Sequence, residues 1–324
     1  MTLPLPRLTS AQAPLTCQID AVNEFGEHQP VFIPAERALT VYVDKRELVT
    51  LMTLGAHPEW LVLGYLRNQR LVNSVHDIES VTVDWDVGAV AVKTRHGIDD
   101  IEEKTARRVV TTGCGQGSVF GGLMEAVDQI RLPADVTISQ SQLYSLVNTI
   151  RIKETTYKSA GSVHACALFD ATSLEPEMLL FVEDVGRHNA IDTIAGWMWL
   201  HPEIVAPTLP VADGSLPSEP AVPPEGDLSS GLAAAPLAPP SAPQALVFYT
   251  TGRLTSEMVM KAAQMDIAVV ISRSGITQMG HALAQDLGLC AIGRALNRRF
   301  LCFSTPRRLR LDIAAATGMA EAGV

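Results

Sequence analysis

The stretch "ALVFYTTGRLTSEMVMKAAQMDIAVVIS", residues 245–272, predicts the fold class of this protein. Its first six and its last six residues are short apolar runs, which are typical of buried strands. The segment between them, residues 255–265, has the pattern of an amphipathic helix. A strand, a helix and a second strand in succession indicate an α/β fold with a sheet that is covered by helices.

The same alternation continues on both sides of this stretch. Further strands are predicted at residues 162–170, 177–184, 289–293 and 300–304, and further helices at 139–153, 188–200 and 276–288. We therefore predict a three-layer α/β/α domain over residues 135–312. Residues 201–244 interrupt it with a Pro-, Ala- and Ser-rich insertion, since 11 of the chain's 20 prolines lie there.

The first half of the chain has a different pattern. Alternating segments at residues 38–54 and 78–94 each predict two strands joined by a turn, and residues 57–72 predict a helix. These elements indicate a smaller α+β domain over residues 21–134, which ends with a glycine-rich loop. Residues 1–20 lack periodicity and are expected to be a flexible tail, and residues 313–324 are expected to be a C-terminal tail.

Composition excludes several classes of partner. The chain has 324 residues and a formal net charge of −10, which disfavours binding to nucleic acid or to an anionic membrane. No apolar run is long enough to span a membrane, and prolines interrupt the N-terminal segment where a signal peptide would be apolar. Five scattered cysteines are typical of free thiols in a reducing cytoplasm.

Arginines follow several predicted strands directly. Arg187, Arg253, Arg273 and Arg294 each stand in such a turn, and Arg298 and Arg299 come shortly after the last. Ligands of open α/β sheets bind at the carboxyl ends of strands, and arginine recognises phosphate through two parallel hydrogen bonds. The turns therefore predict an anion pocket. The alternative is that each arginine is a solvated surface charge.

One cysteine differs from the others. Cys166, Cys290 and Cys302 lie in apolar strand patterns and are expected to be buried, but Cys114 lies in "TTGCGQGSVFGG", residues 111–122. An exposed thiol near cationic groups has a lowered pKa and is more reactive. The alternative is a glycine-rich linker that happens to contain a cysteine.

The segment "SVHAC", residues 162–166, can be compared with the zinc-binding motif of the zinc deaminases. Such an enzyme carries His-x-Glu followed by Pro-Cys-x-x-Cys. Here Cys166 stands where the glutamate is needed, and no Pro-Cys-x-x-Cys occurs in the chain. Zinc deaminase chemistry is therefore not expected, and His164 is either a pocket residue or a core residue.

The stretch "EDVGRHNAID", residues 183–192, resembles the signature of the FdhD family of sulfur carriers, which formate dehydrogenase requires. The segments "LMTLGAHPEWLVLGYL", "SAGSVHACALFD", "TTGRLTSEMVMKAA", "ISRSGITQMGHALAQDLGLCAIG" and "FLCFSTPRRL" are similar to further family segments in the same order. The resemblance implies a cytidine-deaminase-like C-terminal domain without zinc. It also implies homodimerisation.

The function that the resemblance implies is transfer of persulfide sulfur from a cysteine desulfurase to the bis-molybdopterin guanine dinucleotide cofactor, with molybdenum or tungsten, of apo formate dehydrogenase. Cys114 would carry the sulfur. The expected cofactor-binding residues are Arg187, His188, Thr251, Gly252, Arg253, Arg273, Ser274, Arg294, Ala295, Leu296, Asn297, Arg298 and Arg299. The alternative function is a non-catalytic cofactor chaperone or scaffold for maturation of the same enzyme.

Three positions depart from the family pattern. Gly117 stands where many members have a second cysteine, "TTGR" replaces Ser-Gly-Arg, and "GYLRNQRLV" lacks a glutamate. The first departure argues against a dithiol mechanism. It leaves sulfur transfer open, because a persulfide needs only one sulfur acceptor.

Overall fold

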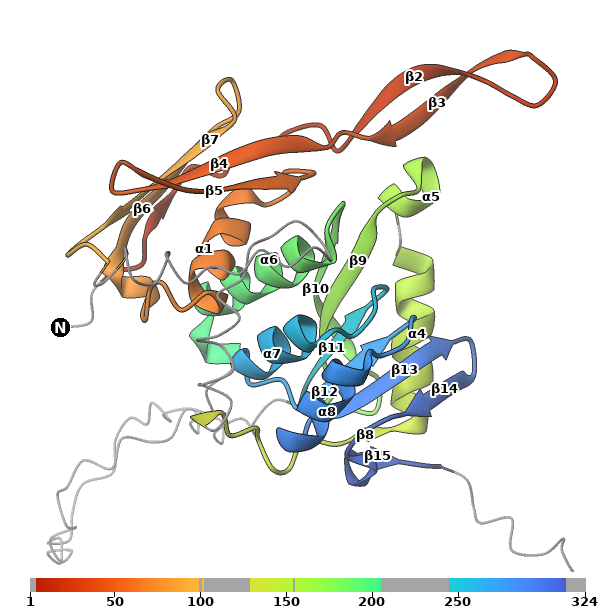
Figure 1. Cartoon of the computed structure of the whole chain (residues 1–324). Helices are drawn as coiled ribbons and strands as arrows, with labels where there is room; N and C mark the ends of the chain where they lie inside the picture. Colours follow the sequence, from red (N-terminus) through yellow and green to blue (C-terminus); the bar gives the residue numbers. More distant parts are fainter. Residues whose placement is uncertain (1–3, 99–100, 102–128, 154, 205–244, 313–324) are drawn as a thin grey trace, which may run out of the picture.

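The computed structural model describes residues 4–98, 101, 129–153, 155–204 and 245–312 (Figure 1). The Cys114 loop, nearly all of the predicted insertion and the predicted C-terminal tail lie outside these residues. The described chain contains two main sheets, one from each half of the sequence, and a helix pair joins them.

The second half forms a six-stranded sheet in the order β10-β9-β11-β12-β13-β14. Strands β11, β12 and β13 are parallel, whereas β9 is antiparallel to both β10 and β11, and β14 is antiparallel to β13. The strands are β9 (His164–Asp170), β10 (Glu177–Asp184), β11 (Leu246–Thr250), β12 (Val269–Ser272), β13 (Cys290–Leu296) and β14 (Arg299–Cys302). The strand and helix pattern predicted for residues 135–312 is confirmed in its order and type.

Helices cover both faces of this sheet. Alternate residues of one strand, such as Leu168 and Phe169 of β9, pack into different hydrophobic clusters. One cluster includes α6 (Arg187–Leu200), α7 (Ser256–Gln264) and α8 (Gln278–Asp286), and the other includes α4 (Gln140–Lys153). Because both faces are buried, the strands are continuous apolar runs, and this made them recognisable in the sequence.

The first half forms a five-stranded sheet in the order β1-β6-β7-β4-β5. Its elements are β1 (Arg7–Leu8), β4 (Arg37–Val43), β5 (Arg46–Thr53), α1 (Pro58–Asn68), β6 (Ile78–Asp84) and β7 (Ala89–Thr94). Helix α1 packs on this sheet and contributes to its core. The strands and the helix predicted for residues 38–94 are confirmed.

Smaller elements complete the described chain. They are the hairpin of β2 (Thr16–Val22) and β3 (His28–Pro34), the short strands β8 (Ile138–Ser139) and β15 (Leu309–Arg310), helix α5 (Thr156–Ala160) and the 3-10 turns η1 (Val75–Asp77), η3 (Pro202–Ile204) and η4 (Pro306–Arg308). Strands β8 and β15 pair with each other beside α4.

The structure corrects the prediction of a loose tail at residues 1–20. Strand β1 pairs with β6, and β2 belongs to the hairpin. Between these strands, the hydroxyl of Thr9 and the backbone N–H of Ala11 donate to Oε1 of the buried Glu59, over 2.6 and 2.7 Å. These contacts use backbone groups and one distant carboxylate, so they do not require a periodic pattern of apolar residues. The sequence of residues 1–20 therefore gave no sign of them.

The two halves meet where α1 crosses α6. Gly64 of α1 and Gly196 of α6 face each other's helix, and a Cβ atom on either would collide with a backbone carbonyl oxygen, that of Asp192 or of Trp60. The helices therefore approach to a distance that only glycine permits at these two positions. This crossing places the N-terminal sheet against the first turn of α6.

Replacing Gly196 with alanine is expected to destabilise the protein. Overpacking costs about 1–3 kcal/mol, and the upper end applies because the obstacle is backbone that cannot rotate away. Alanine regains up to about 1 kcal/mol of helix propensity, so we expect a net loss of roughly 2 kcal/mol in urea unfolding. Gly275→Ala is the matched control, because no atom lies within 4 Å of a Cβ there. Equal stability of the two variants would contradict the close crossing.

Candidate functional site

The predicted arginine turns meet at one edge of the six-stranded sheet. Strands β10, β11 and β12 run in the same direction, so their carboxyl ends lie together. Arg187, Arg253 and Arg273 follow these three ends, and His164 begins β9 opposite Asp184 at the same edge. The alternation of strands and helices thus brings three guanidinium groups around one imidazole.

The pKa of His164 indicates that this edge of the sheet is positively charged. Its half-burial lowers its pKa most, and the positive charges of Arg187, Arg253 and Arg273 lower it further. The imidazole is therefore neutral at pH 7 and adds no charge of its own. A protein with a net charge of −10 thus has a strongly positive edge at this sheet.

Arg187 is the most buried of the three arginines, with 6% of its surface exposed. Its Nε atom is buried and has no hydrogen-bond partner within the described part of the chain. A Cβ on Gly252 would lie 2.6 Å from Cδ of Arg187, so the glycine lets the arginine lie directly on the β11–α7 turn. An unpartnered buried guanidinium nitrogen is costly unless a further acceptor binds it.

Two other predicted residues hold the turns together. The hydroxyl of Thr251 accepts a hydrogen bond from the N–H of Ala165 (3.0 Å), and the hydroxyl of Ser274 donates to the carbonyl of Thr251 (2.8 Å). The hydroxyl of Ser272 donates to the carbonyl of Gly252 (2.7 Å). These side chains fix the backbone that carries the arginines.

The turn between β13 and β14 borders two pockets beside α4. One, of about 510 Å³, is lined by Arg273, Leu296, Asn297 and Arg298 together with residues of α4 and Tyr249. The other, of about 870 Å³, is lined by Tyr144, Arg294, Leu296, Asn297, Arg298, Arg299, Phe300 and Leu301. The described walls of both pockets exclude Arg187 and Arg253. Arg273 belongs to the three-arginine edge around His164 and also lines the smaller of these pockets, so it connects the two parts of the predicted site. Its guanidinium carbon lies over the ring of Tyr157, 5.3 Å from the ring centroid.

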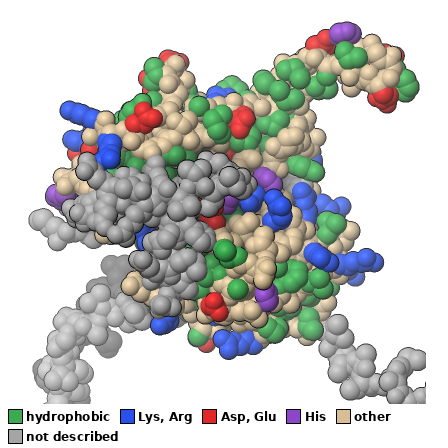
Figure 2. All heavy atoms as spheres, viewed as in Figure 1, with side chains coloured by type: hydrophobic (Ala, Val, Ile, Leu, Met, Phe, Trp, Pro, Cys, Tyr) green, Lys and Arg blue, Asp and Glu red, His purple; other side chains and the backbone are tan. Residues whose placement is uncertain are grey.

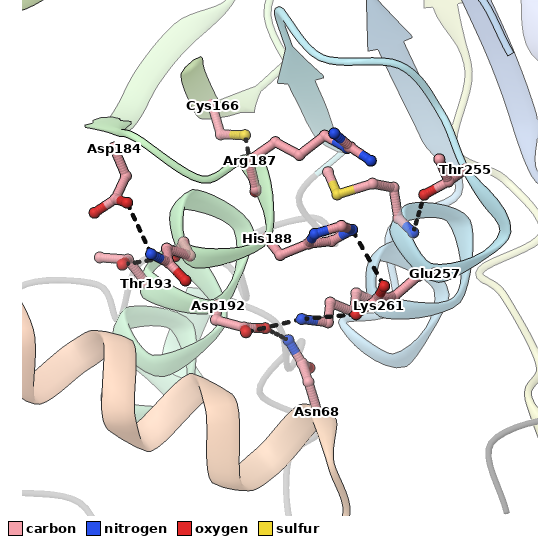
Figure 3. Close-up of polar contacts among 12 residues, drawn as sticks. Asn68, Cys166, Asp184, Arg187, His188, Asp192, Thr193, Thr255, Glu257 and Lys261 are labelled. Carbon is pink, nitrogen blue, oxygen red and sulfur yellow. Dashed lines mark hydrogen bonds and ion pairs between the residues drawn. The ribbon is translucent and has the colours of Figure 1, made fainter. Parts of the chain in front are cut away.

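Two residues of the predicted site, Ala295 and His188, point into the interior of the protein and not toward the pockets. Ala295 is fully buried in the core cluster beneath α4 and lines neither pocket. His188 points into the protein, where Nε2 lies 3.3 Å from Oε2 of Glu257 without hydrogen-bond geometry (Figure 3). Burial, followed by the charges of Lys261 and Arg187, lowers the pKa of His188 to about 2, so the imidazole is neutral.

The sequence prediction missed a buried polar network behind the arginines. Nζ of Lys261 lies 2.8 Å from Oδ2 of Asp192, and Nδ2 of Asn68 donates to Oδ1 of the same carboxylate over 2.7 Å (Figure 3). These side chains come from α7, α6 and α1. The available signal was Lys261, a lysine on the apolar side of the helix predicted for residues 255–265.

Asp184 anchors the start of α6. Its Oδ1 accepts from the N–H of Gly186 (3.1 Å) and from Nδ2 of Asn189 (2.8 Å). Its Oδ2 accepts from the hydroxyl of Thr53 (2.5 Å) and the N–H of Leu54 (3.2 Å) at the end of β5. Asp184 of the "EDVGRHNAID" segment thus holds the turn that carries Arg187 against the N-terminal sheet.

The described cysteines are free thiols in different environments. Cys166 is buried, and burial raises the pKa of its thiol to about 12, which makes it unreactive. Cys290 is buried beside the half-buried Cys302, with sulfur atoms 3.9 Å apart, and Cys17 is exposed. The expected burial of Cys166 and Cys290 is confirmed, and that of Cys302 holds in part. Cys114 lies outside the described residues.

The described residues lack two further features. Across these residues, no three His, Cys, Asp or Glu side chains are grouped so that they could hold a metal ion. None of the described helices combines the length and the apolar composition that a membrane span requires.

The fold and the site define a mixed α/β protein with two main sheets and an arginine-rich sheet edge. The chain belongs to the FdhD/NarQ family, whose model matches residues 34–219 and 239–310. This match confirms the resemblance that the signature segment indicated.

Individual relatives agree with the family. A protein of Bacillus subtilis named sulfur carrier protein FdhD is 27% identical over 85% of this chain and 89% of its own length. A protein of the same name from Bacillus pumilus is 26% identical over 91% of this chain and 92% of its own length. The crystal structure of a candidate formate dehydrogenase accessory protein from Desulfotalea psychrophila has a TM-score of 0.63 at 20% identity, and covers 91% of this chain and 100% of that one. The similarity to this crystal structure shows that the two proteins share a fold.

Proposed function

We propose that this protein is a sulfurtransferase that carries persulfide sulfur from a cysteine desulfurase to the cofactor of formate dehydrogenase. The substrate that receives the sulfur is the bis-molybdopterin guanine dinucleotide cofactor with molybdenum or tungsten. Family membership and the names of the relatives support the sulfur-carrier role. The arginine-rich edge supports the nature of the substrate, because guanine dinucleotides carry phosphates.

The observation that carries the binding part of this proposal is the unpartnered Nε of Arg187. Three arginines around a neutral His164 leave an excess of positive charge at the strand ends. A phosphate would supply acceptor oxygens to these donors in the two-pronged geometry that guanidinium favours. The described residues thus fit the diphosphate of a guanine nucleotide, and Arg273, Asn297 and Arg298 would extend the site toward the pocket beside α4.

The chemical part of the proposal assigns the carrier role to Cys114. Its thiolate would attack the terminal sulfur of the donor persulfide, so that a new S–S bond forms while the bond within the donor breaks. The desulfurase cysteine leaves as a thiolate, and Cys114 then holds the sulfur as a persulfide. With Gly117 in place of a second cysteine, no neighbouring thiol in this motif can discharge that persulfide as a disulfide.

Three further proposals accompany this function. The helices on both faces of the six-stranded sheet support a likeness to cytidine deaminases, without their zinc site. The free thiols of Cys17, Cys166, Cys290 and Cys302 support action in the reducing cytoplasm. We also propose that the protein works as a homodimer, as its family resemblance implies.

The sulfur-carrier proposal is tested by mass spectrometry. The protein is incubated with a cysteine desulfurase and free cysteine, alkylated, digested and mapped for peptides that gained a sulfur atom. We expect the added sulfur on the peptide that contains Cys114 and none on the buried Cys166. Absence of sulfur on Cys114 would refute the carrier role.

Replacing Arg187 with methionine is expected to weaken the binding of guanosine diphosphate by about 10-fold to 100-fold. Hydrogen bonds to charged groups contribute about 1.5–3 kcal/mol, and each 1.4 kcal/mol corresponds to a factor of ten. Calorimetric titration with the nucleotide measures the effect. Arg7→Met is the matched control, because Arg7 is an exposed surface arginine that pairs with Glu79 far from this edge. If both variants bind equally well, the nucleotide does not use the arginine edge.

A further inference from the structure

The β2–β3 hairpin forms an arm that extends from the body of the protein (Figure 1). Its two strands pair only with each other in the described structure. Each strand has seven residues, so the arm is roughly 23 Å long at the usual rise per residue. Among the other elements of the described structure, helix α5 makes the most contacts with the arm, and it lies near the base of the arm.

The arm exposes an unusual amount of apolar surface. Phe25 at its tip is 80% exposed, and Val22, Phe32, Ile19 and Ile33 are also exposed. Figure 2 shows hydrophobic side chains on the surface at several places along the arm. Because an isolated two-stranded hairpin is marginally stable in water, an arm of this kind needs a surface to cover it.

The arm is also acidic. Residues 16–34 contain Asp20, Glu24 and Glu27 but neither lysine nor arginine. The histidine of the arm, His28, lies with Nδ1 2.5 Å from Oδ2 of Asp20. The surface that covers the arm should therefore combine apolar side chains with positive charge.

The larger pocket beside α4 has this composition. Arg294, Arg298 and Arg299 line it together with Tyr144 and with apolar side chains, of which Leu296 and Leu301 are more than one-third exposed, and no acidic side chain contributes to its described walls. We call this pocket the arginine groove. Its lining residues belong to α4, to β13 and β14 and to the turn between these strands. In Figure 1 the arm extends away from these elements, so one chain does not fill its own groove.

We propose that the arm of one copy of this protein docks into the arginine groove of a second copy, and that the second arm docks in return. A twofold axis produces both contacts at once. The groove shares Tyr144, Leu296, Asn297 and Arg298 with the smaller pocket, so each arm would form part of the wall beside its partner's candidate binding site. The inference names the surface of the proposed dimer and uses none of the sulfur chemistry.

The test uses charge reversal on the full-length protein. One variant carries Glu24→Lys and Glu27→Lys in the arm, and the other carries Arg298→Glu and Arg299→Glu in the groove. Each variant alone is expected to lose self-association roughly tenfold or more in analytical ultracentrifugation, because like charges face each other. Glu47→Lys with Asp86→Lys, at exposed positions of the N-terminal sheet, is the control that changes equal charge elsewhere.

An equimolar mixture of the two variants is the decisive sample. In a mixed dimer one contact joins the reversed arm to the reversed groove, and the other joins the two unchanged surfaces, so association should return. Wild-type protein that stays monomeric, variants that dimerise as wild type does, or a mixture that stays monomeric would each overturn the proposal. No cofactor or sulfur donor is present, so the outcome does not depend on the proposed sulfur transfer.

Discussion

Replacing Cys114 with serine is expected to abolish activation of formate dehydrogenase in a strain that lacks its own copy of this protein. A serine hydroxyl is almost fully protonated at neutral pH, and it forms no sulfur–sulfur bond with the donor. The variant should therefore accept no sulfur from the desulfurase. Formate-dependent dye reduction in cell extracts measures the loss, which should equal that of a strain without the gene.

Cys17→Ser is the matched control, because Cys17 is an exposed thiol of the β2–β3 arm and the substitution is equally small. Binding of guanosine diphosphate by the Cys114→Ser protein should remain at the wild-type level, since the arginine edge is unchanged. If formate dehydrogenase stays active with Cys114→Ser, the protein serves as a cofactor chaperone without covalent sulfur. Gly117, which stands where the family resemblance implies a second cysteine, is the feature that favours this alternative.

The sequence predicted the architecture of the second half well because burial on both faces leaves a strong pattern. Residues 245–249 and 267–271 are apolar without interruption, and the structure buries β11 and β12 between two helical layers. The meeting of the arginine turns followed from the same pattern, because parallel strands end at a common edge. Arg187, Arg253 and Arg273 needed no further information to be placed together.

Other features depend on partners far along the chain and have no local pattern. Asn68 and Asp192 are 124 residues apart, and Asp192 and Lys261 are 69 apart, yet they form one buried network. Strand β1 has only two residues and pairs through its backbone. Ala295 was included in the predicted site by its position in an arginine-rich turn, whereas the alternation along β13 turns its side chain into the core.

Lys261 is a charged residue that lies entirely within the described core. Its side chain is fully inaccessible and lies between two carboxylates, 2.8 Å from Asp192 and 3.6 Å from Glu257. Burial alone would lower the pKa of Lys261, but these two carboxylates outweigh burial and raise it above its ordinary value. The ammonium group therefore stays charged and neutralises a carboxylate that no water reaches.

Lys261→Met is expected to reduce the free energy of unfolding by about 3–5 kcal/mol, because it leaves the Asp192 carboxylate buried without a counter-charge. Methionine keeps most of the side-chain volume, so packing changes little. Adding Asp192→Asn should recover part of the loss, since it removes the unpaired charge. Urea unfolding monitored by circular dichroism measures each variant. A loss below about 1 kcal/mol, the usual range of surface pairs, would show that the buried ion pair of Lys261 and Asp192 contributes no more to stability than a surface pair.

The pH dependence provides an independent check on the same variant. A folded-state pKa above the unfolded value of about 10.4 means that the lysine contributes stability below that pH. The contribution is lost as the pH rises through the folded pKa, so the difference between wild type and Lys261→Met should be constant near neutrality and shrink in strong alkali. Lys93→Met is the control, because Lys93 is 64% exposed and pairs with Glu79 at the surface. That variant should lose at most about 1 kcal/mol, so a comparable loss in both variants would mean that burial does not set the strength of the Lys261 contacts.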